Sequence, residues 1–399
     1  MIDTLTPLEL DPYGKEFVTD PYPLYRRLRD EAPVYRSATM PFWALTRYDD
    51  VYASLRDDQA FISGQGVTIE GTEKGMPYLI IKDAPQHSWH KGLAVKIFTR
   101  GRMARLEEFI RVRAIELIEE LGQRESYDWA EDFAAKLPMD VIAELTDIPE
   151  EYRDEIHRWT DIFTLRGDDA DPELIKESHR RRLEIFRELI KDRKRSPKDD
   201  VITLLMTSET PDADGNPYRM TEEDIVYHYS ELGNAGHETV ARALPNCLLA
   251  LHAFPDQRAR LAADLGLAES AADELLRYDN PAQYLGRTTS RDLTLHDVTI
   301  PAGERVLMFI ASAVNDERRF EHPRTLDITR PIDPRSIHFG AGIHKCLGIH
   351  LARTEIRVVL EELFARFPDY TVEPASVTRA ATSNLRGVRS LTIRPGRHA

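Results

Sequence analysis

A long stretch of helical character at about residues 221–252 constrains the fold more than any other feature of the sequence. It opens with Thr221 and Asp224, which are spaced as in a capping box at a helix start. At ~1.5 Å per residue, a helix of this length extends on the order of 45 Å, enough to cross a whole domain. The rest of the chain must therefore pack around one long helix. Pro245 removes a backbone donor inside the stretch, so we expect it to kink the helix.

Apolar residues recur at helical spacing in several further segments, which predicts that helices dominate the fold. Short β-prone runs predict a minor sheet. The expected helices cover residues 103–121, 130–145, 151–165, 172–192 and 347–366, the expected strands lie within 34–46, 284–310 and 388–393, and a surface turn is expected at 211–217. No repeat or linker divides the chain, so we expect residues 1–399 to form a single, mainly α domain with a minor β-sheet region.

The charge balance and the cysteine content exclude several classes of protein. The formal net charge is −15, from 53 Lys plus Arg against 68 Asp plus Glu, which argues against nucleic acid as a partner. Only two cysteines occur, far apart, so the chain has no disulfide framework and suits a reducing cytoplasm. Neither a signal peptide nor an apolar run of roughly 18 residues is visible, so we expect a soluble, cytoplasmic protein without a membrane segment.

The segment of residues 339–348, Phe-Gly-Ala-Gly-Ile-His-Lys-Cys-Leu-Gly, carries the most chemical information. Two glycines before Cys346 permit positive φ angles and a close approach of the backbone to a flat ligand. The cysteine stands at the start of the expected helix 347–366, where backbone N–H groups favour an anion such as a thiolate. The alternative is that Cys346 is a small buried apolar residue, the interpretation that we give to Cys247.

This segment resembles the haem-binding signature of the cytochrome P450 family, F-G-x-G-x-H-x-C-L-G, at every fixed position, and Leu-Ala-Arg follows it. The resemblance implies a haem b (iron protoporphyrin IX) held between the long central helix and the cysteine-loop helix. Cys346 would be the axial iron ligand, Phe339 and Gly340 would contact the haem, and His344 would bind a propionate. A cysteinate ligand donates electron density to iron and favours O–O cleavage.

The long helix carries Ala235-Gly236-His237-Glu238-Thr239, which resembles the family's oxygen-activation motif A-G-x-[D/E]-T. The resemblance implies that Ala235 and Gly236 lie beside the haem and that Glu238 and Thr239 deliver protons to bound dioxygen. His237 holds the variable place and is not expected to be catalytic. A glycine inside a helix costs roughly 1 kcal/mol relative to alanine, so Gly236 needs a reason: either a close ligand or a tight helix crossing.

Two further groups of residues resemble family features. Glu274 and Arg277 resemble the buried E-x-x-R pair that braces the cysteine loop, but Thr325 occupies the place where the family often has a third arginine, and Arg324 is a candidate to replace it. The remaining group would contact the haem propionates and consists of His87, Lys91 and Arg287.

The resemblance implies a monooxygenase that uses O₂ to oxidise a small, largely apolar organic substrate, with electrons from a separate ferredoxin or flavodoxin and its reductase. Lys345, with Lys91 and Arg102, would offer a basic docking face for that partner. The substrate pocket is expected to lie among residues 61–80, 162–178, 282–285 and the first half of the long helix, with polar contacts from Glu231, Asn234, Gln283 and Tyr284. Two rival hypotheses are a peroxygenase on the same fold and a haem-binding carrier or sensor without turnover.

Overall fold

The computed structural model describes residues 8–71, 73–165, 170–379, 382 and 384–396. Helices dominate these residues. The α-helices are α1 (Lys15–Thr19), α2 (Tyr22–Glu31), α3 (Tyr48–Arg56), α4 (Gln86–Ala94), α5 (Arg100–Gly122), α6 (Lys136–Thr146), α7 (Glu150–Thr164), α8 (Pro172–Arg195), α9 (Val201–Thr207), α10 (Glu222–Ala253), α11 (Pro255–Ala263), α12 (Ala268–Tyr278), α13 (Ile310–Ala313) and α14 (Ile349–Arg366).

The strands are short and form a main sheet of five strands and three smaller sheets. Their bounds are β1 (Val34–Arg36), β2 (Trp43–Leu45), β3 (Phe61–Ile62), β4 (Tyr127–Asp128), β5 (Thr210–Pro211), β6 (Pro217–Tyr218), β7 (Leu285–Thr289), β8 (Leu293–Leu295), β9 (Val298–Ile300), β10 (Arg305–Met308), β11 (Thr371–Val372) and β12 (Thr392–Arg394). The main sheet has the order β1-β2-β10-β7-β3, in which β10 runs parallel to β2 and antiparallel to β7. The expectation of a mainly α fold with a minor sheet is confirmed.

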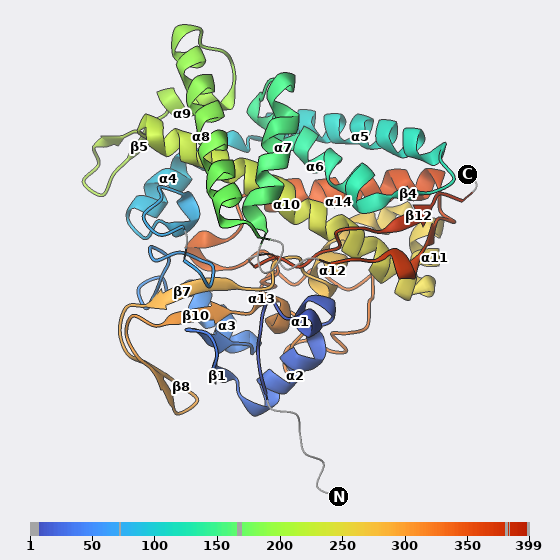
Figure 1. Ribbon diagram of the computed structural model, residues 1–399, viewed down its shortest axis with the longest axis horizontal. Coiled ribbons are helices and arrows are strands. Elements are labelled where there is room, and N and C mark those ends of the chain that lie inside the picture. Colours follow the sequence, from blue (N-terminus) through green and yellow to red (C-terminus); the bar gives the residue numbers. More distant parts are fainter. Residues whose placement is uncertain (1–7, 72, 166–169, 380–381, 383, 397–399) are drawn as a thin grey trace, which may run out of the picture.

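The longest helix, α10, lies in the middle of the helical part of the molecule (Figure 1). It packs against α6 and α8 on one side and against α12 and α14 on the other, while the main sheet lies beyond these helices. Its N-terminus has the predicted capping box: Thr221 Oγ1 accepts the Asp224 amide at 3.1 Å, and the Asp224 carboxylate accepts the Thr221 amide at 3.1 Å. The helix continues through Pro245 to Ala253.

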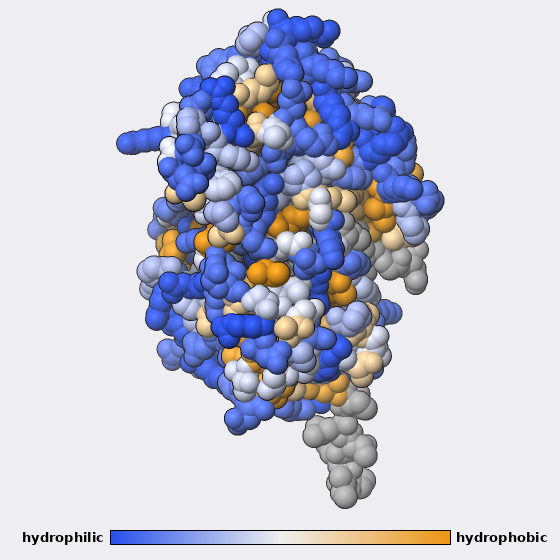
Figure 2. Space-filling view, turned by 90° about the vertical axis from the view of Figure 1, so that its left-hand side faces the viewer, coloured by the Kyte–Doolittle hydropathy of each residue, from blue (hydrophilic) through white to orange (hydrophobic). Residues whose placement is uncertain are grey.

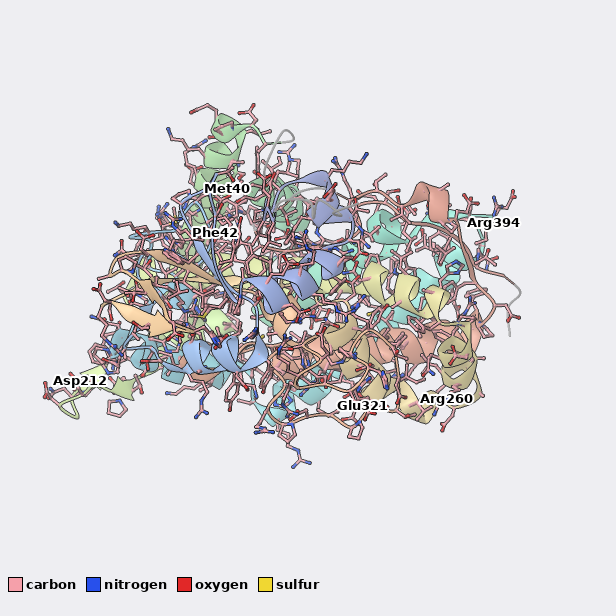
Figure 3. The ribbon with its side chains drawn as sticks, turned by 90° about the horizontal axis from the view of Figure 1, so that it is seen from below. Met40, Phe42, Asp212, Arg260, Glu321 and Arg394 are labelled. Carbon is pink, nitrogen blue, oxygen red and sulfur yellow. The ribbon has the colours of Figure 1, made fainter. Side chains whose placement is uncertain are left out.

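One local structure differs from the sequence expectation, and another confirms it. The segment predicted as one helix over 130–145 divides into a π-helical turn, Trp129–Ala134, followed by α6, and the apolar periodicity does not reveal the change. The loop at 211–217 is the tip of a small hairpin, in which β5 and β6 pair antiparallel. Asp212 marks this tip at one end of the molecule, with Arg394 at the other (Figure 3).

The surface is largely polar where α4 and the β5–β6 hairpin lie. Figure 2 shows this face as mostly hydrophilic, with small separate apolar areas. Among the residues that the structure describes, no helix has both the length and the apolar character that crossing a membrane requires.

Candidate active site around Cys346

The loop before α14 holds Cys346 in a defined backbone conformation. Gly340 and Gly342 have φ angles of 73° and 70°, in the left-handed region that favours glycine. At Gly342 space is also limiting, because a Cβ atom there would lie 2.3 Å from the carbonyl oxygen of Leu55. The loop closes where the Cys346 amide donates to the Phe339 carbonyl at 3.0 Å. The two glycines therefore present Cys346 just before the first turn of α14.

The environment of Cys346 contains donors that favour a thiolate. The residue is accessible, although burial of its sulfur raises the pKa of the thiol. The backbone N–H of Gly348 and the charge of Lys91 act in the opposite direction and lower that pKa. A coordinating metal ion deprotonates a thiol outright, so iron would complete what these two groups begin.

A buried ion pair braces the segment that leads to the cysteine loop. Arg277 donates to both carboxylate oxygens of Glu274, at 2.7 and 2.8 Å, and both side chains are almost completely buried. The same guanidinium donates to the carbonyls of Val314 and Pro323, at 3.0 and 2.9 Å. One arginine thus ties α12 to two points in the long segment between α13 and the loop.

The third member of this brace is Arg330, so the expectation placed on Thr325 and Arg324 is wrong. Arg330 Nε donates to Glu274 at 3.1 Å. Arg324 turns the other way, and its guanidinium lies over the rings of Tyr22 and Tyr278 at 3.5 and 4.0 Å. The sequence did offer a signal for Arg330: the carboxylate of a buried glutamate has more acceptor sites than one arginine fills.

Arg287 and two imidazoles gather beside the loop, and Arg287 and His87 are buried. The rings of His87 and His344 lie 4.1 Å apart, and Arg287 is fully buried nearby on β7. Burial, together with the charge of Lys91 for His87 and of Arg287 for His344, lowers the pKa of His87 to about 4 and that of His344 to about 2. Burial lowers the pKa of Arg287 to about 10.

This cluster fits the propionates of a haem. His87 Nδ1 is buried and has no hydrogen-bond partner. Among the described side chains, no carboxylate lies within ion-pair distance of Arg287, which donates a hydrogen bond to the Gly286 carbonyl at 2.7 Å. A buried arginine without an anion is costly, and a carboxylate would relieve that cost, while the two neutral imidazoles can donate N–H bonds to the same kind of group. His344 Nε2 also bonds the hydroxyl of Ser63 at 3.1 Å, a contact that the sequence analysis missed.

Lys91 departs from its expected role. We expected it to face the same anion as His87, but its ammonium donates to the backbone carbonyls of Ile343 and Lys345 in the cysteine loop. The contact with Lys345 spans 3.3 Å. Burial lowers the pKa of Lys91, and the sulfur of Cys346 counteracts this. In this arrangement Lys91 supports the loop rather than a propionate.

The middle of α10 combines a close helix contact with an accessible surface. At Gly236 a Cβ atom would lie 2.2 Å from Cδ1 of Ile142 on α6, so a tight helix crossing explains this glycine. Ala235 is exposed, in contrast to the buried Glu238 on the same helix. Thr239 Oγ1 donates to the Ala235 carbonyl at 2.8 Å, so a side-chain hydrogen bond joins the two ends of the motif Ala235–Thr239.

The four residues expected to contact substrate have other partners. The carboxylate of Glu231 accepts the amides of Leu79 and Ile80, both at 2.8 Å, and so anchors the 3₁₀ turn Leu79–Ile81. Asn234 accepts a hydrogen bond from Arg182. Their side chains lie on the expected helix face, but both are used to join α10 to neighbouring elements.

Gln283 and Tyr284 lie in the core. The Gln283 side chain accepts the Tyr25 hydroxyl at 2.7 Å and donates to the Asn280 carbonyl at 2.6 Å. The Tyr284 ring packs on Phe309, with the ring centroids 5.4 Å apart. The short β-prone pattern at 284–310 did not reveal which side chains turn inward, because strand residues alternate between faces.

His237 lies opposite the accessible face of α10 and provides a test of the packing. Burial lowers its pKa to about 3, and its Nε2 bonds the Ala135 carbonyl at 3.0 Å. A histidine in an unfolded chain binds its proton below pH ~6.5, whereas the folded chain excludes this proton down to the lowered pKa of His237. Between these two pH values the free energy of unfolding therefore falls as the pH falls. We expect His237→Gln to reduce the slope of unfolding free energy against pH by up to about 1.4 kcal/mol per pH unit in this window. Urea denaturation at several pH values measures the slope. An unchanged slope in the variant would contradict the attribution of this pH dependence to His237.

The comparisons with known proteins agree with this geometry. The sequence profile of the family "Cytochrome P450" matches residues 165–384. A putative cytochrome P450 123 of Mycobacterium tuberculosis is 37% identical over 397 residues, which cover 97% of this chain and 96% of that protein. A vitamin D(3) 25-hydroxylase of Pseudonocardia autotrophica is 36% identical over 369 residues, 90% of this chain and 89% of that protein.

Solved structures show the same fold over almost the whole chain. Cytochrome P450 CYP109Q5 from Chondromyces apiculatus superposes with a TM-score of 0.88 at 31% identity and covers 98% of this chain and 99% of its own. CYP109E1 from Bacillus megaterium, solved with corticosterone, gives a TM-score of 0.84 at 30% identity, with 96% and 100% covered.

A glycine-shaped cysteine loop, with the cluster of His87, His344 and Arg287 beside it, is typical of a haem-thiolate enzyme. The chain belongs to the cytochrome P450 family. It is a haem-thiolate monooxygenase that uses haem b, dioxygen and an organic substrate, and it depends on redox partners.

Proposed function

We propose that Cys346 is the iron ligand, that His87, His344 and Arg287 hold the propionates, and that Glu238 and Thr239 supply protons during oxidation of a small, largely apolar molecule. Bound haem supplies the activation of dioxygen and the transfer of one oxygen atom to the substrate. The observation that carries the proposal is the pairing of the glycine-shaped Cys346 loop with a histidine–arginine cluster that has no anion among the described side chains.

The acid and the alcohol on α10 are positioned to move protons. Glu238 is buried, and its carboxylate lies 3.6 Å from the guanidinium of Arg242 one turn further along. The Thr239 hydroxyl is held at the Ala235 carbonyl and so stays at the accessible part of the helix. Glu238 can exchange a proton with water through movement of its side chain, while Thr239 holds a donor at a fixed place on the helix.

We propose a small acidic electron carrier, a ferredoxin or a flavodoxin with its reductase, as the electron source. Lys345 in the cysteine loop is exposed and offers a positive charge on the thiolate side. The expected basic face is smaller than the sequence suggested, because Lys91 turns into the loop and Arg102 lies 3.7 Å from Asp199. The proposed place of action is the cytoplasm, where a reducing environment preserves a free cysteine thiolate.

The relatives' names guide the proposed substrate skeleton. One relative is a vitamin D(3) 25-hydroxylase, and one structural neighbour was solved with corticosterone. Another neighbour was solved with an acyl carrier protein that bears hexadec-9Z-enoic acid. These ligands all present a large apolar skeleton, and we propose a skeleton of that kind for this enzyme.

If Glu238 and Thr239 supply protons, their replacement should lower turnover with dioxygen more than turnover with hydrogen peroxide. We expect Glu238→Gln to lower ferredoxin-driven turnover by roughly 100-fold, because proton delivery by a positioned side chain contributes on that order. We expect the Thr239→Ala variant to consume electrons from the carrier while it forms little oxidised substrate. Turnover driven by hydrogen peroxide should fall much less, because peroxide brings its own protons. Product, electron consumption and released peroxide are measured together.

The matched control is Glu223→Gln, on the exposed first turn of α10, where the carboxylate pairs with Arg187 at 2.6 Å. It should leave both activities unchanged. Equal losses with both oxidants in the Glu238 variant would contradict the proton role. A wild-type enzyme that works faster with peroxide than with any electron carrier would be a peroxygenase, and one that forms no product with either would be a carrier or sensor.

A further inference from the structure

Arg182 on α8 is a buried cation at the junction of α7, α8 and α10. Its side chain is 1% exposed. The guanidinium carbon lies 4.4 Å from the centre of the Phe163 ring, and Nη1 donates to the side-chain oxygen of Asn234. Its neighbour on α10, Ala235, is the accessible residue of the oxygen-activation motif. Arg182 therefore contacts α10 at the residue that precedes the motif Ala235–Thr239.

The other buried arginines show what is unusual about Arg182. Six arginines of the described chain are fully buried, and four of them have a carboxylate within ion-pair distance: Arg29, Arg193, Arg277 and Arg386. Arg182 and Arg287 have none among the described side chains. Arg287 belongs to the cluster that fits the haem propionates. By the same reasoning, the described side chains do not supply the anion that pairs with Arg182, and a bound ligand would do so.

The free donors of Arg182 specify the shape of that anion. Nη1 is bonded to Asn234, whereas Nε and Nη2 are buried and have no hydrogen-bond partner. These two nitrogens form one edge of the guanidinium, on which two N–H groups point in parallel. A carboxylate accepts two parallel N–H bonds of this kind, with one oxygen opposite each nitrogen. The open edge therefore matches a carboxylate better than a neutral hydroxyl or carbonyl group.

Among the described residues, no carboxylate lies within ion-pair distance of this edge. The carboxylate of Glu238 attracts Arg182 electrostatically, but it forms its ion pair with Arg242, at 3.6 Å. Burial lowers the pKa of Arg182 to about 10, so the guanidinium remains charged at neutral pH.

The surroundings of Arg182 suit an apolar organic molecule with an acidic end. The Tyr78 hydroxyl lies 3.4 Å from His179 Nδ1, and the His179 ring stacks on Phe163 with the centroids 5.5 Å apart. Tyr227 packs edge-on against Tyr78 at 5.1 Å. Burial and the charge of Arg182 lower the pKa of His179 to about 4, so this ring is neutral. The aromatic rings offer apolar contact, and Arg182 offers the one buried positive charge among them.

We infer that Arg182 binds the carboxylate of the substrate, so that the enzyme oxidises an organic acid with an apolar skeleton. The inference rests on the proposed function, because it assigns a substrate class to that same site. Asn234 and Thr239 are five residues apart, about 7 Å along the helix axis. The oxidised carbon is therefore several bonds away from the carboxylate.

The test compares each acid with its own primary amide in the haem-loaded enzyme. Dodecanoate is paired with dodecanamide, and 4-tert-butylbenzoate with 4-tert-butylbenzamide. Binding is followed by the change that each compound causes in the haem absorption spectrum. We expect at least one acid to bind the wild type about 100-fold more tightly than its amide, since loss of one partner of a buried charge pair costs on that order.

Variants show whether Arg182 is the cause. Arg182→Met should remove the preference for the acid, and Arg182→Lys should retain part of it, because lysine keeps the charge but loses the two-pronged edge. The matched control is Arg180→Met on the same helix, where the side chain is 54% exposed and pairs with Glu177 and Glu184. It should leave the preference unchanged.

A second measurement separates ligand binding from a structural role. Without ligand, Arg182→Met removes a buried unpaired charge, so its Tm should equal or exceed that of the wild type. A lower Tm, or a wild type that binds no acid more tightly than its amide, would overturn the inference. The absorption spectrum of the reduced, carbonyl-bound enzyme is recorded in parallel. If it lacks the thiolate band, the proposed function fails; if the band is present and the acid preference is absent, only the inference about Arg182 fails.

Discussion

Replacing Glu274 with alanine should lower the free energy of unfolding by about 3–5 kcal/mol, because the change leaves the buried charge of Arg277 without its partner. The same change removes the acceptor of Arg330 and of the Asp327 amide, which bond one Glu274 oxygen at 3.1 and 3.2 Å. Since whole domains are stable by only about 5–15 kcal/mol, much of the variant should be unfolded or free of haem at 37 °C. Urea denaturation and the ratio of haem to protein measure both effects.

Neighbouring residues supply the controls for this prediction. Glu269→Ala changes an exposed carboxylate in the first turn of the same helix and should have little effect. Arg330→Ala should cost less than Glu274→Ala, because Glu274 keeps its two bonds from Arg277. Arg324→Ala should leave haem binding unchanged if Arg330 is the third member of the brace. A larger haem loss in the Arg324 variant than in the Arg330 variant would contradict this assignment.

Replacing Cys346 with alanine should reduce oxygen-dependent turnover by more than about 100-fold. Loss of a residue that bonds a metal ligand lowers activity by up to about 100-fold. Loss of the iron ligand itself should lower turnover by more than that. The propionate cluster and the loop backbone do not depend on the sulfur, so the variant should still fold and retain some haem. Turnover per bound haem is therefore the quantity to measure.

The other cysteine provides the matched control. Cys247 is buried in α10, and burial raises the pKa of its thiol far above the usual range. Cys247→Ala should leave turnover per haem unchanged and should lower stability slightly, because it removes one buried sulfur. Equal turnover losses in the two cysteine variants would show that general destabilisation, not loss of the iron ligand, causes the effect.

Much of the fold was predictable because its signals are local. The apolar period and the capping residues placed α10 within one residue of its observed ends, and the glycines at 340 and 342 have the positive φ angles that the loop requires. The pattern of residues 339–348 predicted the iron ligand and indicated the family, which the comparisons confirm.

Contacts between distant segments were not predictable from local patterns. The third member of the brace lies 56 residues from Glu274, and the buried carboxylate indicates a further donor without distinguishing Arg330 from Arg324. Glu231 and Asn234 lie on the expected helix face, but their side chains bond the 79–81 turn and α8, whose positions depend on the whole fold. Helical phasing did hold a clue to Arg182, because it shares the buried face of α8 with Phe186 and Leu189, but only the structure shows its free edge.

The central claim is that the Cys346 thiolate binds the haem iron, and the absorption spectrum of the reduced, carbonyl-bound protein tests it most directly. We predict the strongly red-shifted band of a thiolate-ligated haem in the wild type and in Cys247→Ala, and its loss in Cys346→Ala. A wild-type spectrum without this band, or a band that persists after Cys346 is replaced, would contradict the account.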